Sequence, residues 1–331
     1  MPAKQLTAAE YIDGIRAGNR TILSRAITLA ESTRADHKRL AEEIIETLLP
    51  ETGKSIRIGI TGVPGVGKST FIEAFGTHLI EQGRKLAVLA IDPSSSRTRG
   101  SILGDKTRMV ELSRDDRAYI RPSPAGTTLG GVARKTRESI LLCEAAGFDA
   151  IIVETVGVGQ SETAVRWMVD FFLLLMLAGA GDELQGIKRG IMEMADLIAI
   201  TKADGDNAKL ARAAAVEYRT ALHLFPEAAD GWHPQTMTCS AMSREGIDAI
   251  WDKIIEHNQH MLDGEHFEGR RREQSRYWMY ETIHDELRRR FYADPGVAAA
   301  LPETEAEVLA GRTNSFTAAR RVMELYKSES P

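Results

Sequence analysis

The sequence is poor in cysteine, with only Cys143 and Cys239 among its 331 residues. Two isolated cysteines exclude a disulfide framework and a cysteine-based metal cluster. Long apolar runs are also missing: the longest, residues 171–178, is far shorter than the roughly 20 residues that span a bilayer. The first residues lack the apolar core of a secretion signal. We therefore expect a cytoplasmic protein without a membrane partner.

An excess of positive charge is absent as well. Lysine and arginine number 42 and aspartate and glutamate 47, so the formal net charge is −5. A protein whose main role is to wrap nucleic acid is normally basic, and we expect no nucleic-acid partner. The composition, 43% hydrophobic and 27% charged, is that of an ordinary globular chain.

The patterning divides the chain into three regions. Residues 1–50 are predicted to form a helical extension, in which Thr7 and Glu10 have the spacing of a capping box. Residues 51–265 alternate short apolar runs with helix-length segments. Residues 266–331 are predicted to be helical and carry arginine runs at 270–272 and 288–290. Acidic residues interleave with these runs, which favours a solvated or subunit-facing helix over a nucleic-acid patch.

The apolar runs of the middle region predict a sheet. Continuous runs separated by helices are typical of a mainly parallel sheet that helices cover on both faces. The predicted fold class is therefore α/β, and ligands of such sheets bind beyond the carboxyl ends of the strands. The predicted strands are residues 56–61, 86–91, 150–153, 171–177, 197–201 and 236–240.

A phosphate-binding loop follows the first predicted strand. Residues 62–69, GVPGVGKS, fit the pattern G-x-x-x-x-G-K-[ST] and open a helix. In this loop backbone amides ring the phosphates, Lys68 reaches the β and γ phosphates, and Ser69 ligates Mg²⁺. The motif predicts a P-loop domain that binds a nucleoside triphosphate. The residues expected to contact it here are Gly62, Val63, Pro64, Gly65, Val66, Gly67, Lys68, Ser69 and Thr70.

A second motif predicts which base is bound. Thr201, Lys202 and Asp204 follow a predicted strand and match the guanine signature [N/T]-K-x-D of GTPases. A carboxylate at Asp204 accepts two hydrogen bonds from guanine, whereas adenine leaves it unpaired. After the next strand, the segment Ser240, Ala241 and Met242 is expected to offer a backbone amide to the guanine carbonyl. We therefore predict GTP and GDP as the nucleotides.

Acidic residues near the strand ends are candidates for magnesium binding and hydrolysis. Asp92 follows one strand, Asp105 lies in the loop beyond it, and Glu154 ends another. With Ser69 they are the predicted Mg²⁺ ligands, and Glu154 is expected to orient the attacking water. Gly157 is expected to offer its amide to the γ phosphate. No glutamine directly follows Gly157, so slow intrinsic hydrolysis is expected.

A glycine-rich loop, residues 179–190, follows the strand 171–177. Its Asp182 and Lys188 are predicted to serve catalysis from this loop, because it lies at the carboxyl edge of the sheet. A plain connecting loop is the alternative reading.

Together, these motifs resemble those of the MeaB/ArgK family. These are SIMIBI-class P-loop GTPases associated with methylmalonyl-CoA mutase. The segments that carry the resemblance are residues 92–95, DPSS, residues 154–162, ETVGVGQSE, residues 181–188, GDELQGIK, and residues 201–204, TKAD, and the segment 154–162 is highly specific. The resemblance implies a homodimer built partly through residues 266–331. It also implies GTP hydrolysis coupled to the loading and protection of the mutase, which uses adenosylcobalamin.

Two other functions remain open. The first is a kinase that moves the γ phosphate to a transport protein or another acceptor, as an older description of the family suggests. A kinase needs a base for the acceptor hydroxyl, and the sequence contains no H-R-D-type loop. The second is a nucleotide-gated scaffold without meaningful GTP hydrolysis.

Overall fold

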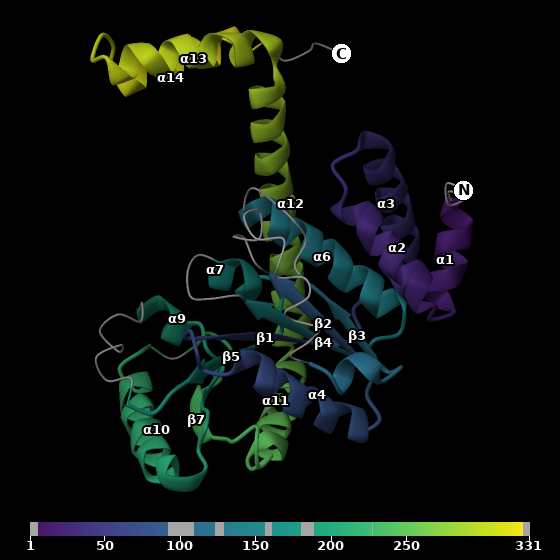
Figure 1. The fold of residues 1–331 in the computed structure, drawn as a ribbon, viewed down its shortest axis with the longest axis vertical. Coiled ribbons are helices and arrows are strands. Elements are labelled where there is room, and N and C mark those ends of the chain that lie inside the picture. The colour runs from purple at the N-terminus through teal and green to yellow at the C-terminus, as the bar shows by residue number, and fades with distance from the viewer. Residues whose placement is uncertain are drawn as a thin grey trace. The chain divides into compact units, whose positions relative to one another are not determined.

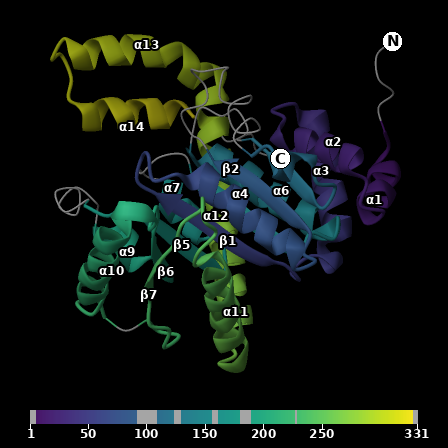
Figure 2. The same cartoon turned by 60° about the horizontal axis from the view of Figure 1, so that its bottom comes forward.

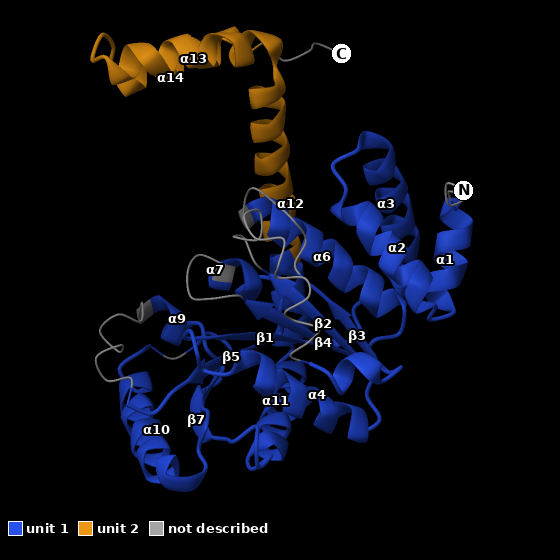
Figure 3. Ribbon diagram, viewed as in Figure 1, with its two compact units in different colours: residues 1–274 blue, residues 275–331 orange. Residues whose placement is uncertain are grey.

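The computed structural model describes residues 6–91, 109–122, 129–155, 161–179, 189–226 and 228–326. The chain separates into two compact units, residues 1–274 and residues 275–331, which Figure 3 colours differently. Each unit is described by itself. The division into regions 1–50, 51–265 and 266–331 stays a prediction.

The first unit contains a seven-stranded sheet in the order β3-β2-β4-β1-β5-β6-β7. Every pairing within it is parallel, so the α/β fold class is confirmed. The strands β2, β5 and β6 are apolar throughout, and β1 and β4 are mostly apolar, because both faces of the sheet are covered. The strands are β1 (Ile56–Gly62), β2 (Leu86–Ile91), β3 (Ala118–Arg121), β4 (Ala150–Thr155), β5 (Phe171–Met176), β6 (Leu197–Ile200) and β7 (Gln235–Thr238).

The strand β3 was not predicted from the sequence. This strand has four residues, Ala118–Arg121, and lies at one edge of the sheet. Charged residues at 115–117 precede it and an arginine ends it. A run this short shows no periodicity of its own, so pairing with β2 decides its conformation.

Helices cover both faces of the sheet. Figures 1 and 2 show α4 and α11 on one face and α6 and α7 on the other. This segregation follows from right-handed crossovers between parallel strands. The helices are α4 (Lys68–Glu81), α6 (Leu129–Ala145), α7 (Ser161–Arg166), α9 (Arg189–Glu193), α10 (Ala208–Leu222) and α11 (Ile247–Asp263), with short 3₁₀ turns η1 (Leu49–Glu51), η2 (Leu112–Arg114) and η3 (Gly205–Asn207).

Three further helices precede β1: α1 (Ala8–Arg16), α2 (Arg20–Glu31) and α3 (Ala35–Leu48). The expected capping box is present, because the Glu10 amide donates to Thr7 Oγ1 at 3.3 Å and the Thr7 amide donates to Glu10 Oε2 at 2.7 Å. Figure 1 shows these helices beside α6 and the β3 side of the sheet. They belong to the first unit.

A network of buried ions lies at the amino edge of the sheet. Arg57 of β1 forms a bidentate pair with Glu144, through hydrogen bonds of 2.8 Å each. Beside it, Arg271 donates to both oxygens of Asp170, at 3.0 and 2.7 Å. Arg271 stands in the first turns of α12 (His266–Ala293), so the start of α12 is fixed to the amino ends of β1 and β5.

The second unit contains the rest of α12 followed by α13 (Pro295–Leu309) and α14 (Ser315–Leu325), which pack against each other. Asp294 caps α13 through the amides of Gly296 and Val297. Asn314 caps α14 through the amide of Thr317. No helix in the described part of the chain is both long enough and apolar enough to cross a membrane.

Candidate functional site

The phosphate loop joins β1 to α4 in the first unit. Gly65 and Gly67 have φ angles of 76° and 91°, a region that favours glycine. A Cβ on Gly62 would lie 2.5 Å from the carbonyl oxygen of Leu175, so this position also requires glycine. Because α4 begins at Lys68, its free amides and positive dipole end face the loop, which is the arrangement that binds phosphates.

Lys68 lies over this loop. Its Nζ donates a hydrogen bond to the carbonyl of Gly62, at 2.8 Å. Burial lowers the pKa of Lys68, while the carboxylates of Glu154 and Glu162 act to raise it. An ammonium group is therefore positioned at the mouth of the loop, close to two acids.

The guanine segment is bonded directly to the phosphate loop. Thr201 Oγ1 donates to the carbonyl of Val66, at 2.9 Å. Lys202, whose φ is 56°, donates from Nζ to the carbonyl of Gly65, also at 2.9 Å. These contacts bring together two segments that the sequence analysis treated as separate motifs.

The third predicted segment completes the base side. Asp204 accepts a hydrogen bond from the hydroxyl of Ser240. The Ser240 amide donates to the carbonyl of Glu245, at 3.0 Å, so Ala241 is the candidate for an amide that meets the guanine carbonyl. Met242 is exposed, and its expected contact with the nucleotide stays a prediction.

The predicted magnesium and hydrolysis residues are described only in part. Glu154 is buried near the carboxyl end of β4, where it pairs in register with Ile60 of β1. The Ser69 hydroxyl and the Glu154 carboxylate are oxygen ligands of the kind that Mg²⁺ binds, so these residues fit the ion. Five predicted site residues lie outside the described residues: Asp92, Asp105, Gly157, Asp182 and Lys188.

Two residues of this region were missed by the sequence analysis. Glu162 of α7 is buried, and its carboxylate acts to raise the pKa of Lys68. Thr155 donates from its hydroxyl to that of Thr61, at 2.7 Å, and joins β4 to β1. An acid that follows a glycine-rich segment at a helix start is a usable signal for Glu162, whereas the Thr155 contact depends on strand register alone.

The Asp204→Asn variant is expected to exchange GTP for xanthosine triphosphate. An amide in place of the carboxylate puts a donor opposite the guanine amine but opposite a carbonyl in xanthine. We expect GTP affinity to fall by at least about a hundredfold, as measured by calorimetry. Asp206→Asn, at an exposed acid two residues away, is the matched control. Unchanged GTP affinity in Asp204→Asn would show that another residue reads the base.

Comparison with known proteins gives matches along nearly the whole chain. The family described as methylmalonyl-CoA mutase-associated GTPase MeaB matches residues 23–296. A putative GTPase of Caulobacter vibrioides is 51% identical over 98% of this chain and 99% of its own length. GTPase ArgK of Escherichia coli is 44% identical over 98% of each chain. The crystal structure of a LAO/AO transport system kinase has a TM-score of 0.77 at 39% identity and covers 98% of this chain and 99% of its own.

Proposed function

The chain belongs to the family of methylmalonyl-CoA mutase-associated GTPases, and on that premise we propose that it uses GTP hydrolysis as a chaperone of methylmalonyl-CoA mutase. In this role, the nucleotide state controls cofactor loading and protection of a mutase that uses adenosylcobalamin. The work would take place in the cytoplasm. The family is described as mutase-associated, and this supports methylmalonyl-CoA mutase as the partner. GTP hydrolysis, the activity after which the family is named, would supply the free energy for the cycle.

The contact between Lys202 and Gly65 carries this proposal from the structure. Together with the bond from Thr201 to Val66, it couples the base-reading segment to the phosphate loop. A change at the γ phosphate is thereby transmitted to the β6 end of the sheet, and a bound guanine holds the loop in place. This is the property that a nucleotide-controlled switch requires.

Magnesium belongs to the same proposal. Ser69 and Glu154 would bind the ion, together with Asp92 and Asp105. A bound Mg²⁺ neutralises charge that develops on the transferred phosphoryl group. Lys68 adds positive charge at the β and γ phosphates, and Glu154 orients water.

The proposed function is tested by titrating purified mutase into the GTPase and measuring phosphate release. We expect the mutase to accelerate hydrolysis by at least about tenfold, because a partner that binds the catalytically competent state more tightly shifts the population towards that state. The Asp182→Ala and Lys188→Ala variants should lose most of this stimulation. Asp206→Asn serves as the control variant. Absence of any stimulation, or full stimulation of both loop variants, would reject the coupling.

The name of the LAO/AO transport system kinase favours a second function, phosphorylation of a transport protein. The two functions differ in the fate of the γ phosphate. GTP labelled at this position should yield free phosphate if the protein is a GTPase chaperone. Label recovered on an acceptor protein in stoichiometric amounts would support the kinase instead.

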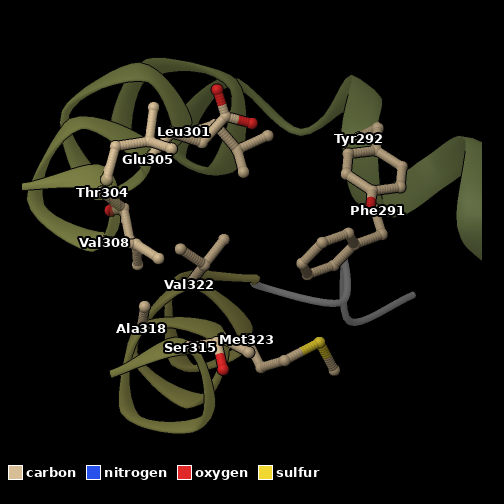
Figure 4. Close-up of a pocket in the computed structure, with 12 residues that line it drawn as sticks. Phe291, Tyr292, Leu301, Thr304, Glu305, Val308, Ser315, Ala318, Val322 and Met323 are labelled. Atoms are coloured by element: carbon tan, nitrogen blue, oxygen red, sulfur yellow. The ribbon is translucent and has the colours of Figure 1, made fainter. Parts of the chain in front are cut away.

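We also propose that the second unit forms the interface of a homodimer. A cavity of about 540 Å³ lies between the end of α12 and the pair α13 and α14, and Figure 4 shows Val308, Val322 and Phe291 around it. Leu309 and Met323 line the same cavity and are 88% and 59% exposed, respectively. An apolar surface of this kind is typical of an interface between protein chains.

The Met323→Glu variant is expected to be a monomer. A carboxylate in the apolar cavity would have to be desolvated on dimerisation, which costs several kcal/mol. Light scattering at micromolar concentration should then give about half the mass of the wild type. Arg320→Glu changes the charge at an exposed position of the same helix and should leave the mass unchanged. A dimeric Met323→Glu protein would exclude this surface as the interface.

A further inference from the structure

A polar cavity lies in the first unit between α2 and β3. Its volume is about 390 Å³. Because β3 is the outermost strand of the sheet and three strand positions from β1, the cavity is separate from the phosphate loop. The guanine segment follows β6, on the opposite side of β1. The cavity is therefore not an extension of the GTP site.

The lining of this cavity is basic. It contains three arginines and three small hydroxyl side chains, and its residues include no acid. This is unusual for a chain with a net charge of −5. The lining residues are Arg20, Thr21, Ser24, Arg25, Thr28, Tyr119, Ile120, Arg121 and Pro122.

The arginines differ in how firmly they are held. Arg121 donates from Nε to Glu31 at 3.0 Å, and its Nη2 donates to Thr28 Oγ1 at 3.2 Å. Arg20 is held weakly: its Nη1 is 3.4 Å from the carbonyl of Asp115 and 3.3 Å from Asp116, whose side chain is fully exposed. The Arg121 side chain is therefore held in one conformation. The Arg20 side chain can reorient toward a ligand with little loss of free energy, because its surface ion pair is weak.

Tyr119 supplies an independent sign of a missing ligand. The residue is 6% exposed, and within the described part of the chain its hydroxyl makes no well-aligned hydrogen bond, although the Ser24 side chain lies within reach of it. A buried hydroxyl that lacks a well-formed hydrogen bond is energetically costly, so a ligand that accepts a hydrogen bond from it would be favoured. Burial also raises the pKa of Tyr119 to about 12, so the group keeps its proton and is a donor.

From these contacts, we infer that the cavity between α2 and β3 binds the phosphate group of a small molecule, as a monoester or a diphosphate. Guanidinium groups match phosphate oxygens in charge and geometry. The hydroxyls of Thr21 and Tyr119 complete the set without requiring a base-specific contact, while the Thr28 hydroxyl already donates to the carbonyl of Ser24, at 2.8 Å. Free phosphates and the phosphates of coenzyme A share this chemistry. The inference does not depend on the proposed partner or on GTP hydrolysis.

Calorimetry on the full chain, with GDP filling the nucleotide site, tests this inference. The probes are coenzyme A, dephospho-coenzyme A, pyrophosphate and inorganic phosphate. We expect at least one phosphate probe to bind with one-to-one stoichiometry and an affinity that falls with salt. Preference for coenzyme A over its dephospho form identifies a monoester, and equal binding of pyrophosphate identifies a diphosphate.

Two variants link the binding to the cavity. Arg20→Gln should weaken it about tenfold, through loss of a charged donor. Tyr119→Phe should weaken it about fivefold while retaining the packing and the melting temperature. Arg39→Gln, at an exposed arginine of α3, should bind as the wild type does, and all three should hydrolyse GTP normally. The inference is overturned if no probe binds up to about 10 mM, or if Tyr119→Phe and Arg20→Gln both bind with wild-type affinity.

Discussion

The Lys68→Ala variant should release phosphate from GTP at least about a hundredfold more slowly than the wild type, because removing one preorganised charge from a site of phosphoryl transfer typically costs about 3 kcal/mol or more. Lys68 already lies at the mouth of the loop, where its Nζ is 2.8 Å from the carbonyl of Gly62. Alanine favours helix at this first position of α4, so the fold should persist. Phosphate release at saturating GTP is the measurement.

Lys54→Ala is the matched control for this loss. Lys54 is exposed and precedes the amino end of β1, so it lies at the other end of the strand that leads to the phosphate loop. Its removal should leave the rate unchanged. A Lys68→Ala protein that hydrolyses GTP at the wild-type rate would mean that the γ phosphate lies elsewhere.

A large loss of stability is expected for Arg271→Met. Its guanidinium makes two bonds to Asp170 and further bonds of 2.5 and 2.7 Å to the carbonyls of Gly53 and Ser55. The side chains of Arg271 and Asp170 are only 14% and 6% exposed. Removing one member of such a pair leaves a buried charge uncompensated and should lower the free energy of unfolding by about 3–5 kcal/mol.

Arg272→Met separates this effect from a general effect of charge. Arg272 is the next residue along α12, is 78% exposed and pairs with Glu268 at 2.9 Å. A surface pair of this kind contributes at most about 1 kcal/mol. Chemical denaturation followed by circular dichroism measures both variants. If Arg271→Met loses no more stability than Arg272→Met, the buried network does not stabilise the chain.

The exposure of the individual arginines in the run 270–272 could not be predicted from the sequence. The run predicts a solvated or subunit-facing helix, and Arg272 is indeed exposed. Arg271, by contrast, is buried against Asp170, more than a hundred positions earlier in the chain. No local pattern distinguishes the two residues. The position at which α12 begins determines that Arg271, and not Arg272, contacts the amino edge of the sheet.

The sheet and the phosphate loop could be predicted from the sequence, unlike the exposure of the arginines in α12. Residues 86–91 are apolar without interruption, and residues 56–61 are mostly apolar, because both sheet faces are covered, and the glycines after β1 are required by local backbone geometry. Such signals are contained within a few residues. The bond from Lys202 to Gly65, the pairing of β3 and the cavity between α2 and β3 arise from residues far apart in sequence, and they become visible only when the chain is folded.

The place of β1 in the sheet has a consequence for synthesis on the ribosome. Ile56 pairs with Ala150, and Ile58 pairs with Phe171, so both neighbours of the strand that carries the phosphate loop are made long after it. Contacts of such high sequence separation form slowly, because a long loop must be closed before they are gained. A nascent chain that ends before β5 lacks one side of β1. It therefore leaves this strand as an apolar edge, open to chaperones or to aggregation, until β5 has emerged.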